Sequence, residues 1–141
     1  MKYWIQFTTE VDEEGTLWHN AYTPDFEAVT QGHTLEECRW MARDLLYFHL
    51  EDRNPQPMER RPEGPGWEQL EVPQTAQLAL AIKRARKARG MTMREVASEL
   101  GVAAGSYQRW ENPRTFNATV QTLEKLAEAL KIKLEVTIGG V

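Results

Sequence analysis

Residues 91–112, MTMREVASELGVAAGSYQRWEN, decide the fold of the second half of this chain. Thr92 is followed three residues later by Glu95, the spacing of a capping box, which predicts that a helix begins here. Gly101 adopts left-handed backbone at little cost, so it predicts that this helix ends at Leu100. Ala103–Trp110 is predicted to be another short helix. The segment therefore predicts two short helices joined by a tight turn.

Helices are also predicted on both sides of this segment, because apolar residues recur there at spacings of three and four. They span Ala76–Arg89 and Thr119–Leu130. In the first of them, apolar residues are expected to face inward and basic residues outward: Leu78, Ile82 and Ala85 against Lys83, Arg84, Arg86, Lys87 and Arg89. Beyond the last helix, Ile132–Ile138 alternates apolar and polar residues, which predicts a final strand.

This arrangement resembles the XRE, or phage-repressor, family of helix-turn-helix proteins over Ala76 to Lys133. The likeness rests on Thr92, Glu95, Ala97, Leu100-Gly101-Val102, Arg109-Trp110-Glu111-Asn112 and Thr122-Leu123-Leu126-Ala127-Leu130. It implies that the helix Ala103–Trp110 enters the major groove of double-stranded operator DNA.

The resemblance also implies which side chains contact DNA. Arg109 suits bidentate donation to guanine, helped by Ser106 and Gln108, while Ala104 can touch a thymine methyl group. Phosphate contacts, which set the register but not the sequence, are expected from five further residues: Thr92, Arg94, Asn112, Arg114 and Asn117. The family often carries Gln, Ser or Thr at positions 104 and 105. Ala104 and Gly105 therefore put the strength of DNA reading in doubt.

The first half of the chain alternates with a period of two, the pattern of strands. Strands are predicted over Lys2–Thr8, Thr16–Tyr22 and Phe26–Gln31, followed by a helix with a capping box of Thr34 and Glu37. One face of that helix is expected to be inward: Leu35, Cys38, Ala42, Leu45 and His49. Trp40 and Tyr47 form a second stripe on it, either a partner surface or additional core.

Five prolines between Asn54 and Gln74 predict a linker, because proline interrupts regular elements. Trp67–Val72 can return one strand from it to the first domain. The predicted fold class is therefore α+β. A small ββ(β)αβ sandwich is built from residues 1–53 and 67–72, with the linker of residues 54–66 between these two pieces. An all-α helix-turn-helix domain with a C-terminal strand occupies residues 73–141.

Charge divides the chain in the same way. Residues 1–71 carry 6 Lys and Arg against 15 Asp and Glu, a net charge of −9. Residues 72–141 carry 11 against 6, a net charge of +5, so the whole-chain value of −4 conceals two opposite halves. The basic half suits phosphates, and the acidic half suits a basic partner.

The first domain resembles that of HicB-type antitoxins. The likeness rests on Lys2-Tyr-Trp-Ile, Gly15, Pro24-Asp25-Phe26, Thr30–Glu37 and Leu70–Pro73, followed by an XRE domain. It implies a degenerate RNase H-like fold that binds and neutralises a HicA-like mRNA-interferase toxin, in a protein that represses its own operon. Aromatic and acidic residues are the candidates for partner binding: Trp4, Glu13, Trp18, Asp25, Phe26 and Trp40.

Two other functions are weighed against this one. A repressor whose first domain binds a different ligand or protein would share the DNA-binding half. A nuclease would need several carboxylates around a metal, one of them central on the first strand, where Lys2–Thr9 has none. The three histidines and Cys38 lack metal-ligand spacing, so no enzyme activity, metal or cofactor is expected.

The remaining expectations concern location and assembly. A chain with one cysteine, no secretory signal and no run of about 18–20 apolar residues is expected in the cytoplasm, away from membranes. Helix-turn-helix domains usually read two half-sites as dimers. The lone strand Ile132–Ile138 also invites pairing with a second copy. We therefore expect at least a homodimer, and a tetramer if two surfaces associate.

Overall fold

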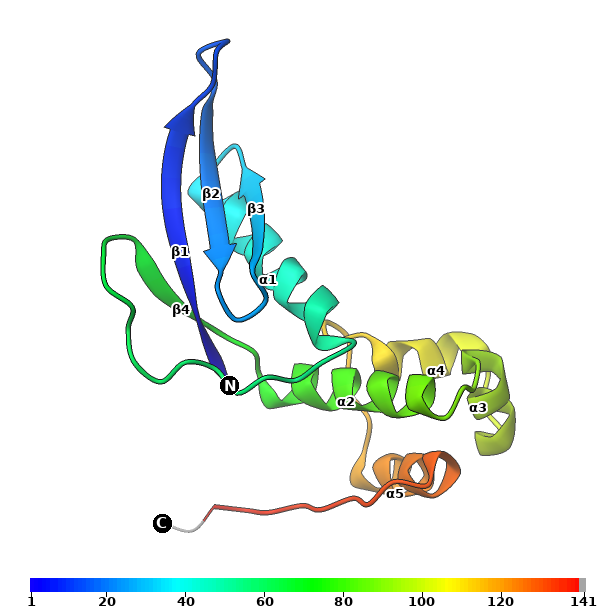
Figure 1. Ribbon diagram of the computed structural model, residues 1–141. Helices are drawn as coiled ribbons and strands as arrows, with labels where there is room; N and C mark the ends of the chain where they lie inside the picture. The colour runs from blue at the N-terminus through cyan, green and yellow to red at the C-terminus, as the bar shows by residue number, and fades with distance from the viewer. Residues whose placement is uncertain (140–141) are drawn as a thin grey trace. The chain divides into compact units, whose positions relative to one another are not determined.

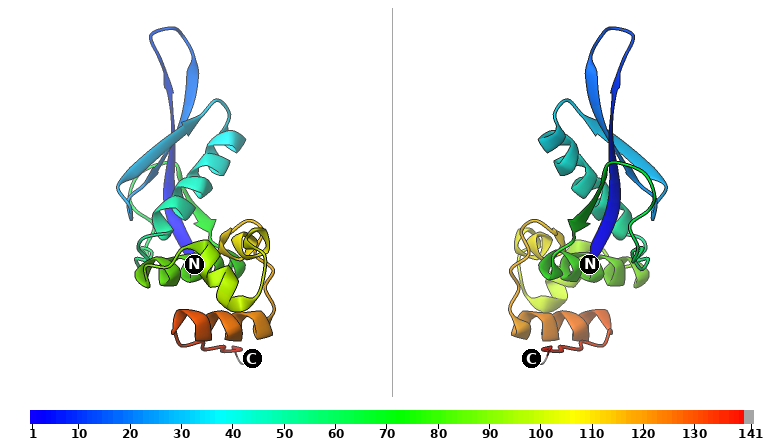
Figure 2. Two further views of the ribbon diagram at one scale, coloured as in Figure 1. Left: turned by 90° about the vertical axis from the view of Figure 1, so that its right-hand side faces the viewer. Right: turned by 90° about the vertical axis from the view of Figure 1, so that its left-hand side faces the viewer.

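The structure, a computed structural model, describes residues 1–139 and divides into two compact units, Met1–Gln74 and Thr75–Val141. Figures 1 and 2 show the ribbon. The first unit is a four-stranded antiparallel sheet with one helix, and the second is a group of helices. The chain is thus α+β, and its helix-turn-helix segment lies in the second unit.

The sheet of the first unit has the strand order β3-β2-β1-β4, with every neighbouring pair antiparallel. Its elements are β1 Lys2–Val11, β2 Leu17–Thr23, β3 Ala28–Gly32 and β4 Trp67–Glu71, with the helix α1 at Leu35–Leu50. Side chains alternate between the two faces of a sheet. Tyr3, Ile5 and Ala21 are buried on one face, and α1 contacts β2 and β3. The alternation predicted from the sequence therefore places the apolar residues on one face of the sheet, and α1 covers that face.

The third strand begins later than predicted. Residues 24–27 form a turn instead, in which the Phe26 amide donates to Thr23 O and the Glu27 amide donates to Pro24 O. Glu27 adopts a left-handed φ of 50° there. The prediction of a strand from Phe26 was therefore wrong by two residues, because proline and the turn that follows it take these amides out of the ladder.

The helix α1 begins as predicted but differs in detail. Thr34 caps it by accepting from the Glu37 amide, whereas the Glu37 carboxylate accepts from the His33 amide rather than from Thr34. The predicted inner face was correct at Cys38 and Ala42 but wrong at Leu45 and His49. The residues buried in the structure are Cys38, Ala42, Leu46, Tyr47 and Leu50. Tyr47 is therefore core, while Trp40 from the same predicted stripe is exposed.

The proline-rich segment after α1 is tied to strand β1 by hydrogen bonds. The Tyr3 hydroxyl donates to Pro55 O at 3.1 Å, and the Phe7 amide donates to Gly66 O at 2.8 Å. Gly66 then leads directly into β4, which pairs with β1 over Lys2–Gln6. The segment thus returns the chain to the edge of the sheet.

The second unit consists of α2 Gln74–Ala88, α3 Met93–Leu100, α4 Ala104–Glu111 and α5 Val120–Leu130. All four contribute to one core, whose buried members are Ile82, Val96, Ala97, Tyr107, Leu126 and Leu130. Leu100, Val102 and Trp110 pack against it while partly buried. The apolar spacing of the sequence correctly predicts these helices.

The final strand predicted over Ile132–Ile138 is not formed. Within residues 1–139, the segment that follows α5 belongs to no sheet. A strand is defined by a ladder of hydrogen bonds to a neighbour, and the described part of a single chain offers none here. The segment runs extended after α5 (Figure 1) and lies outside the sheet, and the amide of its first residue, Ile132, donates to Ala127 O.

A first prediction concerns Gly66 and its control Gly15, which have nearly equal left-handed φ angles of 83° and 84°. A Cβ at Gly66 would overlap the Phe7 carbonyl oxygen, whereas a Cβ at Gly15 would have no atom of the described residues within 4 Å apart from those of its two chain neighbours. Both alanine variants incur a backbone cost of about 1–2 kcal/mol, and Gly66→Ala should lose about 1–3 kcal/mol more. Urea unfolding followed by tryptophan fluorescence measures this difference. Equal losses would contradict the proposed close approach.

Candidate nucleic-acid interface

The helix α3 is fixed at both ends by its own residues. Thr92 Oγ1 accepts from the Glu95 amide at 3.1 Å, and the Glu95 carboxylate accepts from the Thr92 amide at 3.2 Å. This reciprocal capping box confirms the predicted helix start. Gly101 closes the helix in left-handed conformation at φ 69°. The Val102 amide then donates to Ala97 O, which starts the turn toward α4.

The helix α4 is held in place by a buried residue and an ion pair. Tyr107 is fully buried between the helices, with its ring edge toward Trp110. One turn later, Glu111 is 5% exposed and receives two hydrogen bonds from the Arg86 guanidinium of α2, at 2.6 and 2.9 Å. Arg86 also donates to Met91 O in the loop before α3. One guanidinium therefore connects α2, the α3 entry and the end of α4.

The electrostatics around this ion pair follow from burial. Burial and the Glu111 carboxylate raise the pKa of Tyr107 far above its usual value, so this hydroxyl stays neutral. The hydrogen bonds to Glu111 raise the pKa of Arg86, which remains charged. The charged Arg86 guanidinium therefore lies against Glu111 on the inner side of α4, the helix that the sequence predicts to read DNA.

All nine residues predicted to contact DNA are exposed in the structure. They are Thr92, Arg94, Ala104, Ser106, Gln108, Arg109, Asn112, Arg114 and Asn117. Four lie on α4 itself, two at the start of α3, and three in the loop after α4. The burial pattern thus leaves the predicted contact face of α4 accessible while its opposite face forms the core.

Two of these side chains already have local roles. Thr92 Oγ1 caps α3, and Asn112 Oδ1 accepts from the Arg114 amide at 2.9 Å, which shapes the loop after α4. In the described part of the chain, no side chain caps the start of α4, where Ala103 precedes Ala104. The first backbone amides of α4 therefore remain without side-chain caps. Unpaired amides at a helix N-terminus favour negatively charged groups.

Residues 82–136 match the helix-turn-helix family model. This match covers α3, α4, α5 and the C-terminal half of α2 from Ile82 on, and it indicates an XRE-type helix-turn-helix domain in the second unit. No curated protein matches the chain.

Arg86 lies in a different environment from the one predicted for it. It was expected to face outward with the other basic residues of α2, but its side chain is only 12% exposed. The sequence spacing of both charged residues could have indicated that they are buried. Arg86 lies four residues after the buried Ile82, and Glu111 lies four residues after the buried Tyr107, so each shares the inner face of its helix. Two opposite charges on facing inner surfaces indicate a buried pair.

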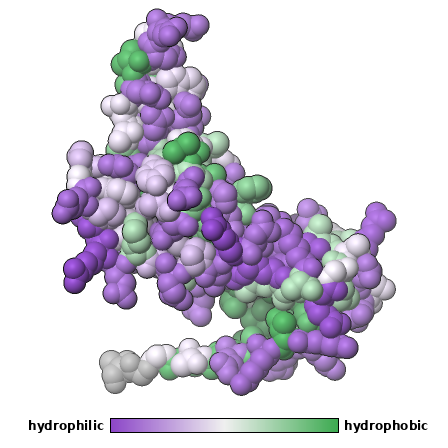
Figure 3. All heavy atoms as spheres, in the orientation of Figure 1, coloured by the Kyte–Doolittle hydropathy of each residue, from purple (hydrophilic) through white to green (hydrophobic). Residues whose placement is uncertain are grey.

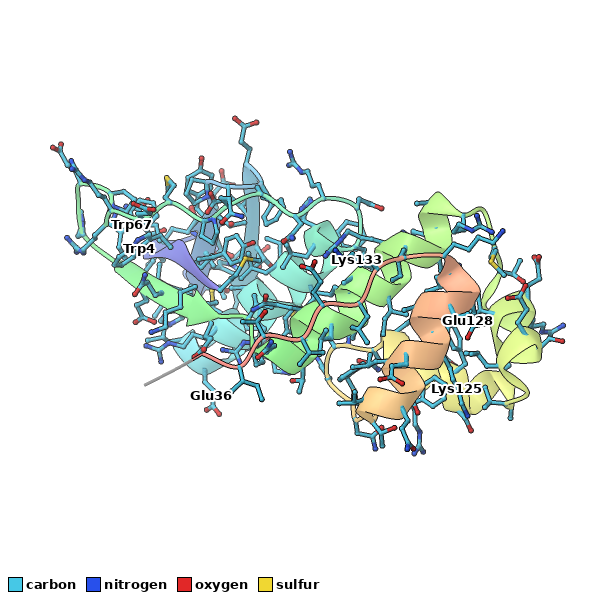
Figure 4. The ribbon with its side chains drawn as sticks, turned by 90° about the horizontal axis from the view of Figure 1, so that it is seen from below. Trp4, Glu36, Trp67, Lys125, Glu128 and Lys133 are labelled. Carbon is cyan, nitrogen blue, oxygen red and sulfur yellow. The ribbon has the colours of Figure 1, made fainter. Side chains whose placement is uncertain are left out.

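The six predicted partner-binding residues of the first unit lie on different sides of its sheet. Trp4 and Trp18 share the face opposite the buried Tyr3 and Ile5. Trp40 is 53% exposed on α1, which covers the other face. Figure 4 labels Trp4 beside Trp67, which come from the neighbouring strands β1 and β4. These aromatic residues therefore do not form a single surface.

Phe26 was wrongly predicted to be one of the partner-binding residues, because it is buried. Its ring is 4% exposed, stacks on His49 at a centroid distance of 5.1 Å and lies 6.0 Å from Tyr3. The turn at residues 24–27 directs it into the core instead of leaving it on a strand surface. Asp25 next to it is half-buried, and burial raises the pKa of its carboxyl group.

The tip of the β1–β2 hairpin carries the acidic residues. Asp12 accepts from the Trp18 indole at 2.9 Å and from the Glu14 and Thr16 amides. The Trp18 hydrogen bond is the main cause that lowers the pKa of Asp12. Glu13 is exposed at the turn. Just below it, the cross-strand partners Val11 and Leu17 are 65% and 47% exposed, so this tip combines negative charge with apolar surface.

The described residues, 1–139, contain neither a group of metal-ligating side chains nor a helix able to cross a membrane. Within them, no group of three or more His, Cys, Asp or Glu side chains could hold a metal ion. In the same part of the chain, no helix has the length and apolar character needed to cross a membrane. Cys38 is a buried free cysteine, and burial raises the pKa of its thiol.

A second prediction compares Arg86–Glu111 with a matched pair in the other unit. Arg39 and Glu68 form the same two-bond arrangement, at 2.7 and 3.0 Å, but are 45% and 41% exposed. Glu111→Gln should destabilise the helical unit by about 3–5 kcal/mol, because it leaves a buried charge without its partner. Glu68→Gln should cost about 0–1 kcal/mol. Amide hydrogen exchange of each unit reports the two losses separately. A loss at Glu111 no larger than at Glu68 would contradict the role given to the buried pair.

Proposed function

We propose that this protein is a transcription repressor that binds double-stranded operator DNA through α3 and α4. The observation that carries the proposal is the helix-turn-helix domain of residues 82–136, in which α4 buries one face and exposes the other. The net charge of +5 over residues 72–141 supports a phosphate-bearing partner.

In this proposal α4 lies in the major groove. Arg109 donates two hydrogen bonds to a guanine, and Ser106 and Gln108 contact neighbouring base edges. Ala104 and Gly105 bring the backbone close to the DNA and offer at most an apolar contact with a thymine methyl group. Sequence reading therefore depends mainly on one arginine.

The phosphate contacts come from the two ends of the motif. Thr92 and Arg94 stand at the start of α3, and Asn112, Arg114 and Asn117 stand in the loop after α4. Such contacts position a domain on the duplex without reading its sequence. A helix-turn-helix dimer places two of these motifs about 34 Å apart, so we propose that two copies bind one operator.

A third prediction tests this mode of reading with Arg109→Ala and a control of equal charge change, Lys125→Ala. Lys125 is exposed on α5 (Figure 4) and has no part in the proposed contacts. Arg109→Ala should weaken binding to the DNA upstream of the gene by about 1–3 kcal/mol and affect random DNA much less. Lys125→Ala should change both affinities slightly and equally.

The measurement is a binding titration at several salt concentrations. Affinity for both DNAs should fall steeply as salt rises, because binding releases counterions from the phosphates. Absence of binding at low salt would contradict the proposal. So would an Arg109→Ala loss that is the same on upstream and random DNA, because Arg109 would then act only as a charge.

We further propose that the first unit is the toxin-binding half of a HicB-like antitoxin, which neutralises a HicA-like mRNA interferase in the cytoplasm and represses its own operon. The support is the sequence resemblance together with the net charge of −9 over residues 1–71. An RNA-cutting toxin needs a basic surface for its substrate, and an acidic partner can cover that surface and speed its own association. The degenerate RNase H-like fold and the absence of enzyme activity belong to the same proposal.

The tip of the β1–β2 hairpin is the best-supported part of that surface. Glu13 and Glu14 give it charge, while Val11 and Leu17 give it apolar area that a partner can bury. Trp18 lies beside it and is held by Asp12. Charged rims around apolar centres are typical of protein interfaces.

A fourth prediction uses the product of the short gene expected next to this one. Co-expression with the wild-type chain should relieve its toxicity, and the double variant Glu13→Lys, Glu14→Lys should lose much of this protection through like-charge repulsion. The double exchange Glu124→Lys, Glu128→Lys reverses two exposed acids on α5, is the control of equal charge change and should protect fully. Arg109→Ala should also protect, because it affects only DNA binding. Full protection by the Glu13→Lys, Glu14→Lys variant would exclude the hairpin tip as the contact.

A further inference from the structure

The segment that follows α5 has the sequence of a strand and no strand beside it within residues 1–139. Its even positions are apolar, Ile132, Leu134, Val136 and Ile138, and its odd positions are Lys133, Glu135 and Thr137. Ile132, Val136 and Ile138 are 42%, 63% and 90% exposed. An extended segment with an apolar face and unpaired backbone groups is a template for another strand.

The same segment borders a hollow on the helical unit. Residues 132–135 form one wall, and apolar side chains of α2 and α5 form the others: Leu78, Ala81, Ile82, Leu123, Leu126 and Ala127. Its volume is about 410 Å³. Figure 4 shows Lys133 on the segment where it runs past α2, and Figure 3 shows apolar surface on the helical unit above it. An apolar layer is thus left open along this side of the unit.

We propose that residues 132–138 form a dimerisation strand, which pairs antiparallel with the same segment of a second copy about a two-fold axis at Leu134. The two apolar rows then lie on one face of the new ribbon and cover the hollows between α2 and α5 of both copies. This assembly satisfies the unpaired backbone and removes the exposed apolar side chains from water.

The apolar row limits the possible registers. In a two-fold antiparallel pair, the even positions of both strands share a face only when a residue, and not a peptide bond, lies on the axis. An axis at Lys133 or Glu135 would place that charge opposite its own copy, which destabilises a pair. An axis at Leu134 instead places each Lys133 opposite the partner's Glu135 and each Ile132 opposite the partner's Val136.

Among these registers, only the axis at Leu134 pairs Lys133 with Glu135, so the charges favour a second copy as the occupant and this axis as the register. Within one chain, Lys133 Nζ lies 2.8 Å from Glu135 Oε1, and the two side chains are 83% and 71% exposed. They share the polar face of the extended segment, because side chains at positions i and i+2 of a strand point to the same side. A second copy brings the complementary pair to this face, in reverse order.

This inference deepens the proposed DNA-binding function, because it supplies the contact that joins two helix-turn-helix motifs. Its test needs neither DNA nor toxin. Association can therefore be found where DNA binding fails, or DNA binding can be found where this strand pairing fails, and the two proposals are judged separately.

The test is sedimentation of the full-length chain with Lys133→Glu, Glu135→Lys, and the double exchange. Wild type should be a dimer at micromolar concentration. Each single variant places like charges opposite each other at both ends of the pair, so its dimer should dissociate at least about tenfold more readily. The double exchange should restore wild-type association. A mixture of the two single variants should also restore it, because one strand is then doubly negative and its partner doubly positive.

Each outcome decides the proposal. A monomeric wild type, or single variants that associate as tightly as wild type, would overturn the dimerisation strand. Single variants that weaken association but are not rescued by mixing or by the double exchange would overturn the register.

A cross-link gives an independent reading of the axis. Residues opposite each other in an antiparallel pair have Cα atoms about 4.5–5.5 Å apart, within the range of a disulfide. Leu134→Cys should therefore form a covalent dimer on mild oxidation. Ile132→Cys should not, because its partner copy lies several residues away along the ribbon. Faster cross-linking of Ile132→Cys would overturn the axis at Leu134.

Discussion

The helical unit depends on the ion pair between Arg86 and Glu111. Each group lies on the inner face of its helix, and each would be costly to bury alone. Two Arg86 donors bind the Glu111 carboxylate, and a third donates to Met91 O before α3. The pair therefore fixes the position of α4 relative to α2 and α3. Because α4 is only eight residues long, it has few other contacts that could hold its exposed face in a defined orientation.

This constraint separates two tasks within one short helix. Tyr107 and Glu111 anchor its inner face, while Gln108 and Arg109 remain on its outer face. An arginine that reads a base must be placed within hydrogen-bond distance by a rigid support. The buried pair supplies this support. It matters for the proposed contacts because Ala104 and Gly105 offer no hydrogen bond to a base, which leaves Arg109 as the main base-reading residue.

Local chemistry made much of the fold predictable. The capping box of Thr92 and Glu95, the left-handed Gly101 and the alternation in β1 act over a few residues, and the sequence displays them directly. The start of β3 was harder, because the turn after Pro24 competes with the strand pattern. The later turns of α1 were also misassigned, since Leu45 and Leu46 are both apolar and only the sheet determines which of them is buried.

The exposure of the outer residues of α4 could be predicted from the sequence, but the buried ion pair beneath this helix could not. Exposed polar residues around a helix-turn-helix follow from the motif, whereas Arg86 appeared to belong to a row of surface cations. Recognising it requires pairing two charges 25 residues apart on facing inner surfaces. The predicted final strand was wrong for the single chain, because alternation in the sequence does not supply a neighbouring strand to pair with.

The central claim is that α4 reads a specific operator as part of a two-fold assembly. The most direct measurement is to recover the genomic DNA fragments that the full-length chain binds at physiological salt and to determine their shared sequence. The account predicts a two-fold symmetric site upstream of the gene, with half-sites separated by whole helical turns of about 34 Å and a guanine in each for Arg109. Recovery of fragments without a shared sequence, or with a single unsymmetric element, would contradict it.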